Sequence, residues 1–123
     1  MQRNLSITAI LGMIAIILGA FGAHALKEKL GTDALQSFQT GIRYQFYHVI
    51  VLLFVNSYSG FSSRTKDIIS SLFFVGILFF SGSIYAITAG GINPKAIWFI
   101  TPLGGVLFII GWFVMFLKFL KKD

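Results

Sequence analysis

Four long stretches without a charged side chain dominate this sequence. They cover roughly residues 4–26, 44–63, 68–94 and 96–117. An α-helix rises about 1.5 Å per residue and the hydrocarbon core of a bilayer is about 30 Å thick, so about 20 apolar residues can cross it. Each stretch is about that long. The pattern predicts an all-α, polytopic membrane protein.

Composition separates this chain from a soluble domain. Its residues are 56% hydrophobic and 11% charged, whereas about a quarter of the residues in a soluble domain are charged. Only helices and closed barrels satisfy their backbone groups inside lipid, and these stretches lack the alternation of barrel strands. We predict one membrane domain over 1–123, an up-down bundle of four transmembrane helices at about 5–26, 44–61, 68–89 and 97–117.

The longest connection predicts a further helix. Within 32–43, apolar residues recur at helical spacing and continue into the second span, at Leu35, Phe38, Ile42 and Phe46. Polar residues occupy the other face: Gln36, Gln39, Thr40 and Arg43. This pattern predicts an amphipathic helix at the membrane interface, with Gly41 as the turn into the second span. Packing of this segment on the bundle is the alternative that the sequence leaves open.

Small residues at helical spacing predict where helices pack closely. In the first span they are Gly12, Ala15, Gly19, Gly22 and Ala23, and in the fourth span they are Gly104 and Gly111. Small side chains let helix backbones approach each other in lipid, where packing drives association. We expect both stripes to face neighbouring helices.

The basic residues predict an orientation and a class of partner. The formal net charge is +6. The side of both termini carries Arg3, Arg64, Lys66, Lys118, Lys121 and Lys122, and the opposite side carries Lys27, Lys29, Arg43 and Lys95. Because cytoplasmic loops are enriched in Lys and Arg, we expect both termini in the cytoplasm. Cations beside apolar spans favour anionic lipid headgroups over nucleic acid as the counter-charge.

Antiparallel spans bring polar and aromatic residues together on the opposite, outer side. The candidate ligand-binding residues are His24, Lys27, Arg43, Tyr44, Gln45, Tyr47, His48, Ser81, Ser83, Tyr85 and Thr101. Polar groups in lipid are costly unless they are paired. Three interpretations compete: a hydrogen-bonded network that fixes helix packing, a site for an anionic lipid headgroup, or proton, metal or catalytic chemistry by the two histidines.

Metal and cofactor chemistry find little support in the sequence. The chain has no cysteine, and its uncharged stretches contain no Asp or Glu. Zinc sites usually use about three or four protein ligands, so two histidines do not suffice, and we predict no metal and no cofactor. Polar residues at the other end of the spans, including Asn4, Thr8 and Asn56, are interpreted as parts of terminal turns without function.

The leading functional hypothesis follows from the outer-side residues and the lack of a catalytic motif. We expect an integral membrane protein without enzymatic activity that interacts with membrane lipids, anionic ones among them, or with a membrane partner. One alternative is a small transporter or channel acting as a homo-oligomer, because four short helices enclose little polar volume. Another is a lipid-modifying enzyme that uses His24 or His48.

Five motifs in order carry a family resemblance over essentially the whole chain. They are GAFGAHAL at 19–26, FQTG at 38–41, YQFYH at 44–48, FSGSIY at 80–85 and ITPLGG at 100–105. Together with the length, they resemble the YgdD-like family of small membrane proteins, a bacterial domain-of-unknown-function family. The resemblance implies four spans in the cytoplasmic membrane and no established activity. It transfers no catalytic residue.

Overall fold

The structure, a computed structural model, describes residues 2–121, apart from the side chains of Phe21 and Ala23. Lys122, which counted in the charge comparison, lies outside the described residues. The elements in order are α1 (Gln2–Ile17), the π-helical turn η1 (Leu18–Gly22), α2 (Ala23–Leu26), α3 (Thr32–Ser57), α4 (Ser63–Thr88), the 3-10 turn η2 (Pro94–Ala96) and α5 (Ile100–Leu120).

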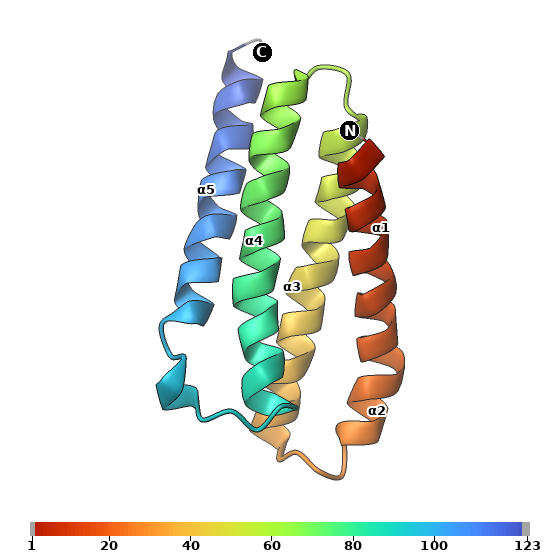
Figure 1. The fold of residues 1–123 in the computed structure, drawn as a ribbon, viewed down its shortest axis with the longest axis vertical. Helices are drawn as coiled ribbons and strands as arrows, with labels where there is room; N and C mark the ends of the chain where they lie inside the picture. The colour runs from red at the N-terminus through yellow and green to blue at the C-terminus, as the bar shows by residue number, and fades with distance from the viewer. Residues whose placement is uncertain (1, 122–123) are drawn as a thin grey trace.

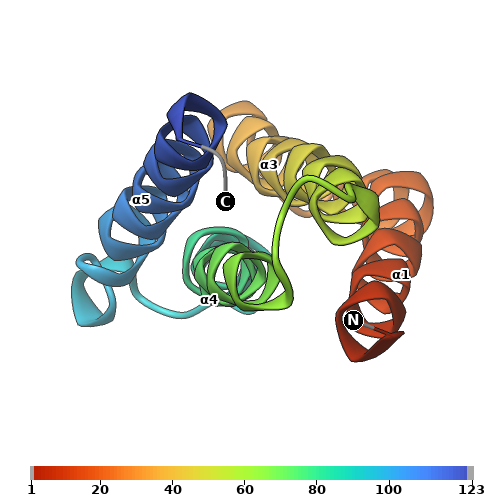
Figure 2. The same ribbon diagram turned by 90° about the horizontal axis from the view of Figure 1, so that it is seen from above.

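The helices form four long, roughly parallel rods, of which α1, η1 and α2 together make the first (Figure 1). Consecutive rods run antiparallel, so α1 begins and α5 ends at the same end of the molecule. Each rod contacts mainly the next one along the chain: α1 with α3, α3 with α4, and α4 with α5. Seen from above, α1 and α5 lie on opposite sides of the central α3–α4 pair (Figure 2).

Three rods in the described part of the chain are long and apolar enough to cross a membrane: Gln2–Leu26, Ser63–Thr88 and Ile100–Leu120. This confirms the predicted class, a helical membrane protein. α3 has 26 residues and equals α4 in length, but Arg43, Gln45 and His48 interrupt its apolar sequence. The four-span count therefore stays a prediction.

The predicted helix over 32–43 is confirmed, but the predicted turn at Gly41 is wrong, because α3 runs unbroken from Thr32 to Ser57. Gly41 is buried against α4, where an added Cβ would lie 3.0 Å from Tyr85 and 3.2 Å from Ile84. The Ser81 hydroxyl donates to the Gly41 carbonyl oxygen at 2.6 Å. The glycine thus allows close helix contact instead of a bend, and 32–43 packs on the other helices.

The glycine seam predicted for the fourth span is confirmed. An added Cβ on Gly104 would lie 2.3 Å from the Phe80 backbone nitrogen, and one on Gly111 would lie 2.4 Å from the Phe73 ring. Any larger side chain would push α5 away from α4. Small residues therefore set the distance between these helices.

The small residues of the first span also face a neighbour. Added Cβ atoms on three of them would contact α3 side chains at 3.3–3.6 Å: Gly12 at Val49, Gly19 at Ile42 and Gly22 at Phe38. Ala15 is 2% exposed, whereas the Ala23 side chain lies outside the described part. The predicted packing stripe is therefore confirmed where the structure describes it.

The fourth predicted span begins later than expected. Asn93 accepts a hydrogen bond from the Lys95 backbone N–H at 2.9 Å and caps the short turn η2. The η2 turn is not continuous with α5. The helix α5 therefore starts at Ile100 and continues to Leu120.

Candidate functional site

The structure divides the eleven candidate residues between the interior and the surface. Six are buried or half-buried between helices: Gln45, His48, Ser81, Ser83, Tyr85 and Thr101. Five are exposed: His24, Lys27, Arg43, Tyr44 and Tyr47. The candidates therefore include both residues enclosed between helices and residues on the outside of the molecule.

Gln45 joins three helices near the middle of α3. Its Nε2 donates a hydrogen bond to the Leu11 carbonyl oxygen of α1 at 2.8 Å, and its Oε1 accepts one from the Tyr85 hydroxyl of α4 at 2.7 Å. The Tyr85 ring packs on Phe38 with centroids 5.4 Å apart. A buried amide bonded at both ends fixes the relative positions of α1, α3 and α4.

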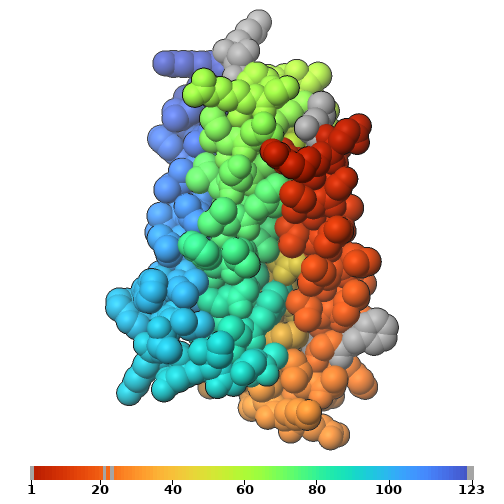
Figure 3. Space-filling model, in the orientation of Figure 1, coloured from red at the N-terminus to blue at the C-terminus, as the bar shows by residue number. Residues whose placement is uncertain are grey.

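This junction lies beneath a furrow between α1 and α4. In the space-filling view, atoms of α3 are visible between these two helices (Figure 3). The furrow has a volume of about 340 Å³, and Gln45 and Tyr85 contribute to its lining. The remaining lining is mostly apolar, with Leu11, Phe74 and Leu78 among its residues, so the furrow presents hydrocarbon to the membrane.

His48 is held in one protonation state by its two partners. Its Nδ1 lies 2.7 Å from the Tyr44 carbonyl oxygen, which only accepts, so Nδ1 carries the proton. Its Nε2 lies 3.1 Å from Trp112 Nε1–H, which only donates, so Nε2 is the acceptor. His48 is therefore the neutral Nδ1–H tautomer, and both ring nitrogens are occupied within the protein.

The His48 ring also packs between aromatic side chains of the two neighbouring helices. It stacks on Phe108 of α5 with centroids 3.8 Å apart and meets Phe73 of α4 edge-on at 4.9 Å. Stacked and edge-on aromatic contacts add to the energy of burial. His48 thereby acts as a packing residue between α3, α4 and α5.

The hydroxyl groups of the buried set form further links between helices. Ser81 bonds to the backbone of α3 at Gly41. Ser83 of α4 is hydrogen-bonded to Thr101 of α5. Across residues 2–121, with the two omitted side chains excepted, every fully buried side-chain nitrogen or oxygen has a hydrogen-bond partner. The buried candidates are thus satisfied by each other and by the backbone.

The two histidines lie far apart. Gly12 of α1 faces Val49, so His48 is level with this part of α1. His24 is exposed and lies about twelve residues further along the same rod, which corresponds to about 18 Å at the helical rise. The two histidines therefore do not form a joint site.

The exposed candidates on α3 are a cation and two tyrosines. The Arg43 guanidinium donates through Nη2 to the Thr40 hydroxyl one turn earlier at 3.0 Å. The Tyr44 ring lies 5.8 Å from that of Tyr47 and 4.9 Å from that of Phe80. This surface combines a fixed positive charge with aromatic groups.

An open groove separates α1 from α3 beside Arg43. Its volume is about 320 Å³. We call it the Arg43 groove, and its lining consists of Ala15, Ile16, Gly19, Ala20, Ile42, Arg43, Phe46 and Tyr47. Apart from the Arg43 guanidinium and the Tyr47 hydroxyl, the lining side chains are apolar. The groove therefore offers one charge at the edge of a hydrocarbon surface.

The level of Arg43 along the helices follows from its neighbour Ile42. Ile42 faces Gly19, whereas the rod ends at Leu26, about seven residues or about 10 Å further along at the helical rise. The backbone of Arg43 therefore lies well inside the end of this rod. Its bond to Thr40 points the side chain toward that end, as expected for a snorkelling arginine.

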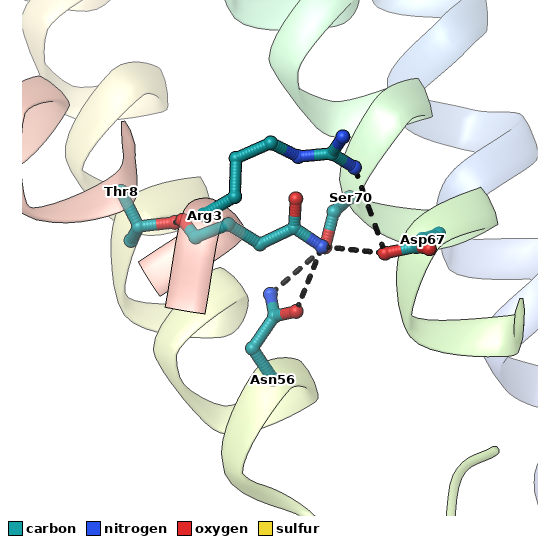
Figure 4. A network of polar contacts seen from close by, with 6 residues as sticks. Arg3, Thr8, Asn56, Asp67 and Ser70 are labelled. Carbon is teal, nitrogen blue, oxygen red and sulfur yellow. Dashed lines mark hydrogen bonds and ion pairs between the residues drawn. The ribbon is translucent and has the colours of Figure 1, made fainter. Parts of the chain in front are cut away.

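Sequence reasoning missed a buried polar network at the other end of the molecule (Figure 4). Asn4 of α1 donates to Asn56 of α3 at 3.1 Å and to Asp67 of α4 at 2.9 Å. Asn56 donates to Ser70 of α4 at 2.8 Å. We call these four residues the Asn56 network. The prediction that Asn4 and Asn56 lie in terminal turns of their helices is confirmed, but it missed their pairing, because Asn4, Asn56 and Ser70 are each at most 3% exposed.

A sequence signal for the Asn56 network does exist. Thr8 follows Asn4 by one helical turn, and its hydroxyl bonds to the Asn4 carbonyl oxygen at 2.7 Å. Asn56 follows an apolar run in the second uncharged stretch. Ser70 lies near the start of the third uncharged stretch. Polar residues in three successive apolar segments at one end favour mutual pairing.

Comparison with known proteins agrees with the helical membrane architecture. The family model described as "Protein of unknown function (DUF423)" matches residues 18–105. The chain is 39% identical to a UPF0382 membrane protein of Staphylococcus aureus over 121 residues, covering 98% of both chains. It is 40% identical to the UPF0382 membrane protein YwdK of Bacillus subtilis over 117 residues, covering 92% of both chains.

A relative from Escherichia coli, the UPF0382 inner membrane protein YgdD, is 36% identical over 114 residues, covering 87% of this chain and 81% of YgdD. No solved structure is significantly similar to the chain. The matches cover most of the length and include all five motifs at least in part. The chain therefore belongs to the DUF423 family and is related to the UPF0382 membrane proteins, YgdD among them.

Proposed function

We propose that this protein is a non-enzymatic integral membrane protein that binds anionic lipid through the exposed candidate residues. The observation that carries the proposal is Arg43, a cation on the outer face of α3 beside an apolar groove. A guanidinium forms strong, paired hydrogen bonds with phosphate oxygens. Lys27 and His24 are exposed near the end of the first rod and add donors near the headgroups.

The buried polar groups support a binding role over catalysis. A catalytic acid, base or nucleophile needs a free position facing a substrate. His48 uses both ring nitrogens inside the protein, and Gln45 is bonded at both ends of its amide. These residues stabilise the helix arrangement and leave the recognition of other molecules to the surface.

The proposal includes four membrane crossings. α3 lies side by side with α1 and α4 over nearly its full length (Figure 1), so a membrane crossed by those two helices is crossed by α3 as well. The E. coli relative is called an inner membrane protein, and we propose the same location for this protein. The excess of Lys and Arg near the termini favours a cytoplasmic location for both ends.

Native mass spectrometry of the purified protein with added phosphatidylglycerol tests the proposal. Arg43→Gln should lose bound lipid relative to the wild type, because it removes the charge but keeps a polar side chain of similar reach. Lys95→Gln is the matched control, since Lys95 is an exposed cation in the η2 turn. Equal lipid retention by Arg43→Gln and the wild type would contradict the proposal.

A further inference from the structure

We infer that the Arg43 groove seats one acyl chain of a lipid whose single phosphate binds Arg43. This inference rests on the proposed lipid binding and specifies its site and its ligand. The ligand class is a diacyl lipid with an anionic phosphodiester, such as phosphatidylglycerol. Charge, depth and shape each contribute to the inference.

The charge of Arg43 lacks a counter-charge within the described part of the protein. Its described polar contact is the neutral Thr40 hydroxyl. Arg3, by comparison, faces a carboxylate, that of Asp67, at the opposite end of the rods. A cation in contact with lipid is costly unless an anion accompanies it. The membrane itself supplies that anion as a lipid phosphate.

The depth of Arg43 distinguishes a lipid from a soluble anion. Its backbone lies about 10 Å inside the end of the first rod at the helical rise. The bond to Thr40 brings the guanidinium about three residues, or about 4.5 Å at the helical rise, closer to that end, so a small phosphate ion that reached the charge would leave the apolar groove beside the deeper backbone empty. A lipid phosphate is already tethered to chains that occupy the same depth. The favoured ligand is therefore an amphiphile.

The shape of the groove fits an extended chain. The turn η1 of the first rod contributes the small residues Gly19 and Ala20, so little side-chain volume covers the backbone there. Ile42 and Phe46 form the wall on α3. A π-helical turn of this kind is uncommon and occurs frequently at functional sites. The groove continues from Arg43 past Phe46 and Ile16, and a chain lying there points away from the interface.

The size of the groove argues against a transmembrane helix as the occupant. About 320 Å³ is at the small end of ligand-sized pockets, which span about 300–1,000 Å³. A helix with its side chains is about 10–12 Å across and would have to widen the gap between α1 and α3. One acyl chain requires no such movement.

A groove-filling substitution tests the inference separately from the charge. Ala20→Trp places a large side chain in the groove and leaves Arg43 intact. Ala9→Trp is the matched control, because Ala9 is likewise an exposed alanine of the first rod but does not line the groove. Native mass spectrometry with dioleoyl phosphatidylglycerol should show about tenfold weaker binding for Ala20→Trp, the scale of about two acyl-chain methylene groups that lose their apolar contact, and unchanged binding for Ala9→Trp.

The ligand is identified by comparing three probes on the wild type. Phosphatidylglycerol should bind, whereas dioleoylglycerol, which lacks the phosphate, and glycerol 3-phosphate, which lacks the chains, should each bind at least about tenfold more weakly. Equal binding of dioleoylglycerol would remove the role of the phosphate. Equal binding of glycerol 3-phosphate would remove the role of the chain. Either result would overturn the inference.

The outcomes separate this inference from the proposed function. If Arg43→Gln loses lipid but Ala20→Trp and Ala20→Leu bind normally, the groove inference fails and lipid binding stands. If Arg43→Gln binds normally, both fail. Ala20→Leu is the smaller substitution and keeps the test valid if Ala20→Trp does not fold, as judged by circular dichroism and gel filtration. Equal losses in Ala9→Trp and Ala20→Trp would also overturn the groove inference.

Discussion

Asn56 and Arg43 are both polar residues of the same helix, yet the structure uses them in opposite ways. Asn56 is fully buried and bonds to α1, to α4 and to the Leu52 carbonyl oxygen of its own helix. Arg43 is exposed and bonds to Thr40 within α3. The Asn56 network closes one end of the molecule, whereas the Arg43 groove leaves a charge available to the membrane.

This difference teaches that residue type does not decide the role of a polar group in a membrane helix. The face of the helix decides it, because that face determines whether another helix or lipid is the neighbour. Inward-facing polar groups find partners in the protein and stabilise it. Outward-facing ones find partners in the bilayer and become candidates for recognition. Substitutions at the two places should therefore affect different measurements.

Asn56→Leu should have the largest effect on stability. It removes the hydrogen bonds to Asn4, Ser70 and Leu52, and an unsatisfied buried partner costs about 1–3 kcal/mol. Unfolding by SDS titration in mixed micelles measures the change. Gln39→Leu removes the same kind of side chain from an exposed position of α3 and should have little effect. Similar losses for the two variants would contradict the role of the network.

His48→Phe should destabilise the protein less. The aromatic stack on Phe108 is kept, and the bond to Trp112 is lost; hydrogen bonds between membrane helices contribute about 0.6 kcal/mol on average and up to about 1.7. In a Trp98→Phe background, the emission of Trp112 should shift as its N–H loses its acceptor.

The His48–Trp112 bond is checked by a double-mutant cycle. If the bond exists, the combined His48→Phe/Trp112→Phe variant should lose less stability than the sum of the single losses. Strict additivity would count against the bond and against the Nδ1–H tautomer derived from it.

Asp67→Asn should reduce stability less than Asn56→Leu or His48→Phe. The substitution removes the charge that faces Arg3 at 4.0 Å, in an exposed pair, and such pairs contribute about 0–1 kcal/mol. The amide oxygen can still accept from Asn4. Asp67→Ala, which removes the acceptor as well, should be less stable than Asp67→Asn in the same SDS titration. The reverse order would show that charge, and not hydrogen bonding, holds this edge of the network.

Arg43→Gln should have the smallest effect on stability, within about 0.5 kcal/mol as for most surface substitutions, while it loses bound lipid. Asn56→Leu should show the opposite combination: the protein should be less stable, but the molecules that remain folded should bind lipid as the wild type does. The contrast between the two variants tests whether Asn56 and Arg43 have different roles. A large stability loss in Arg43→Gln at constant lipid content would indicate an undetected structural role.

Several features of the fold could be predicted because they depend on local sequence. The length of the uncharged stretches predicts membrane-spanning helices, and the stripe of small residues predicts close helix packing at Gly104 and Gly111. The helical pattern over 32–43 was also correct. The turn at Gly41 was predicted wrongly because a glycine in a helix serves equally for a bend or for close packing, and only the position of α4 distinguishes the two.

The candidate site was harder to predict for the same reason. Arg43, Gln45 and His48 lie within six consecutive residues, and the sequence grouped them as one outer cluster. A helix turns by about 100° per residue, so neighbours in sequence face different directions. Gln45 faces α1 and α4, His48 faces α4 and α5, and Arg43 faces outward.

The amino-acid sequence by itself determined that this protein is helical and belongs in a membrane, because length and hydrocarbon content alone decide that partition. It also determined the family and the packing stripes. Only the tertiary structure decided which polar groups are hydrogen-bonded to another helix and which face outward, since this pairing depends on contacts between residues far apart in the chain. Asn4 and Asn56 stabilise each other across 52 positions, whereas the described hydrogen bond of Arg43 stays within its own helix.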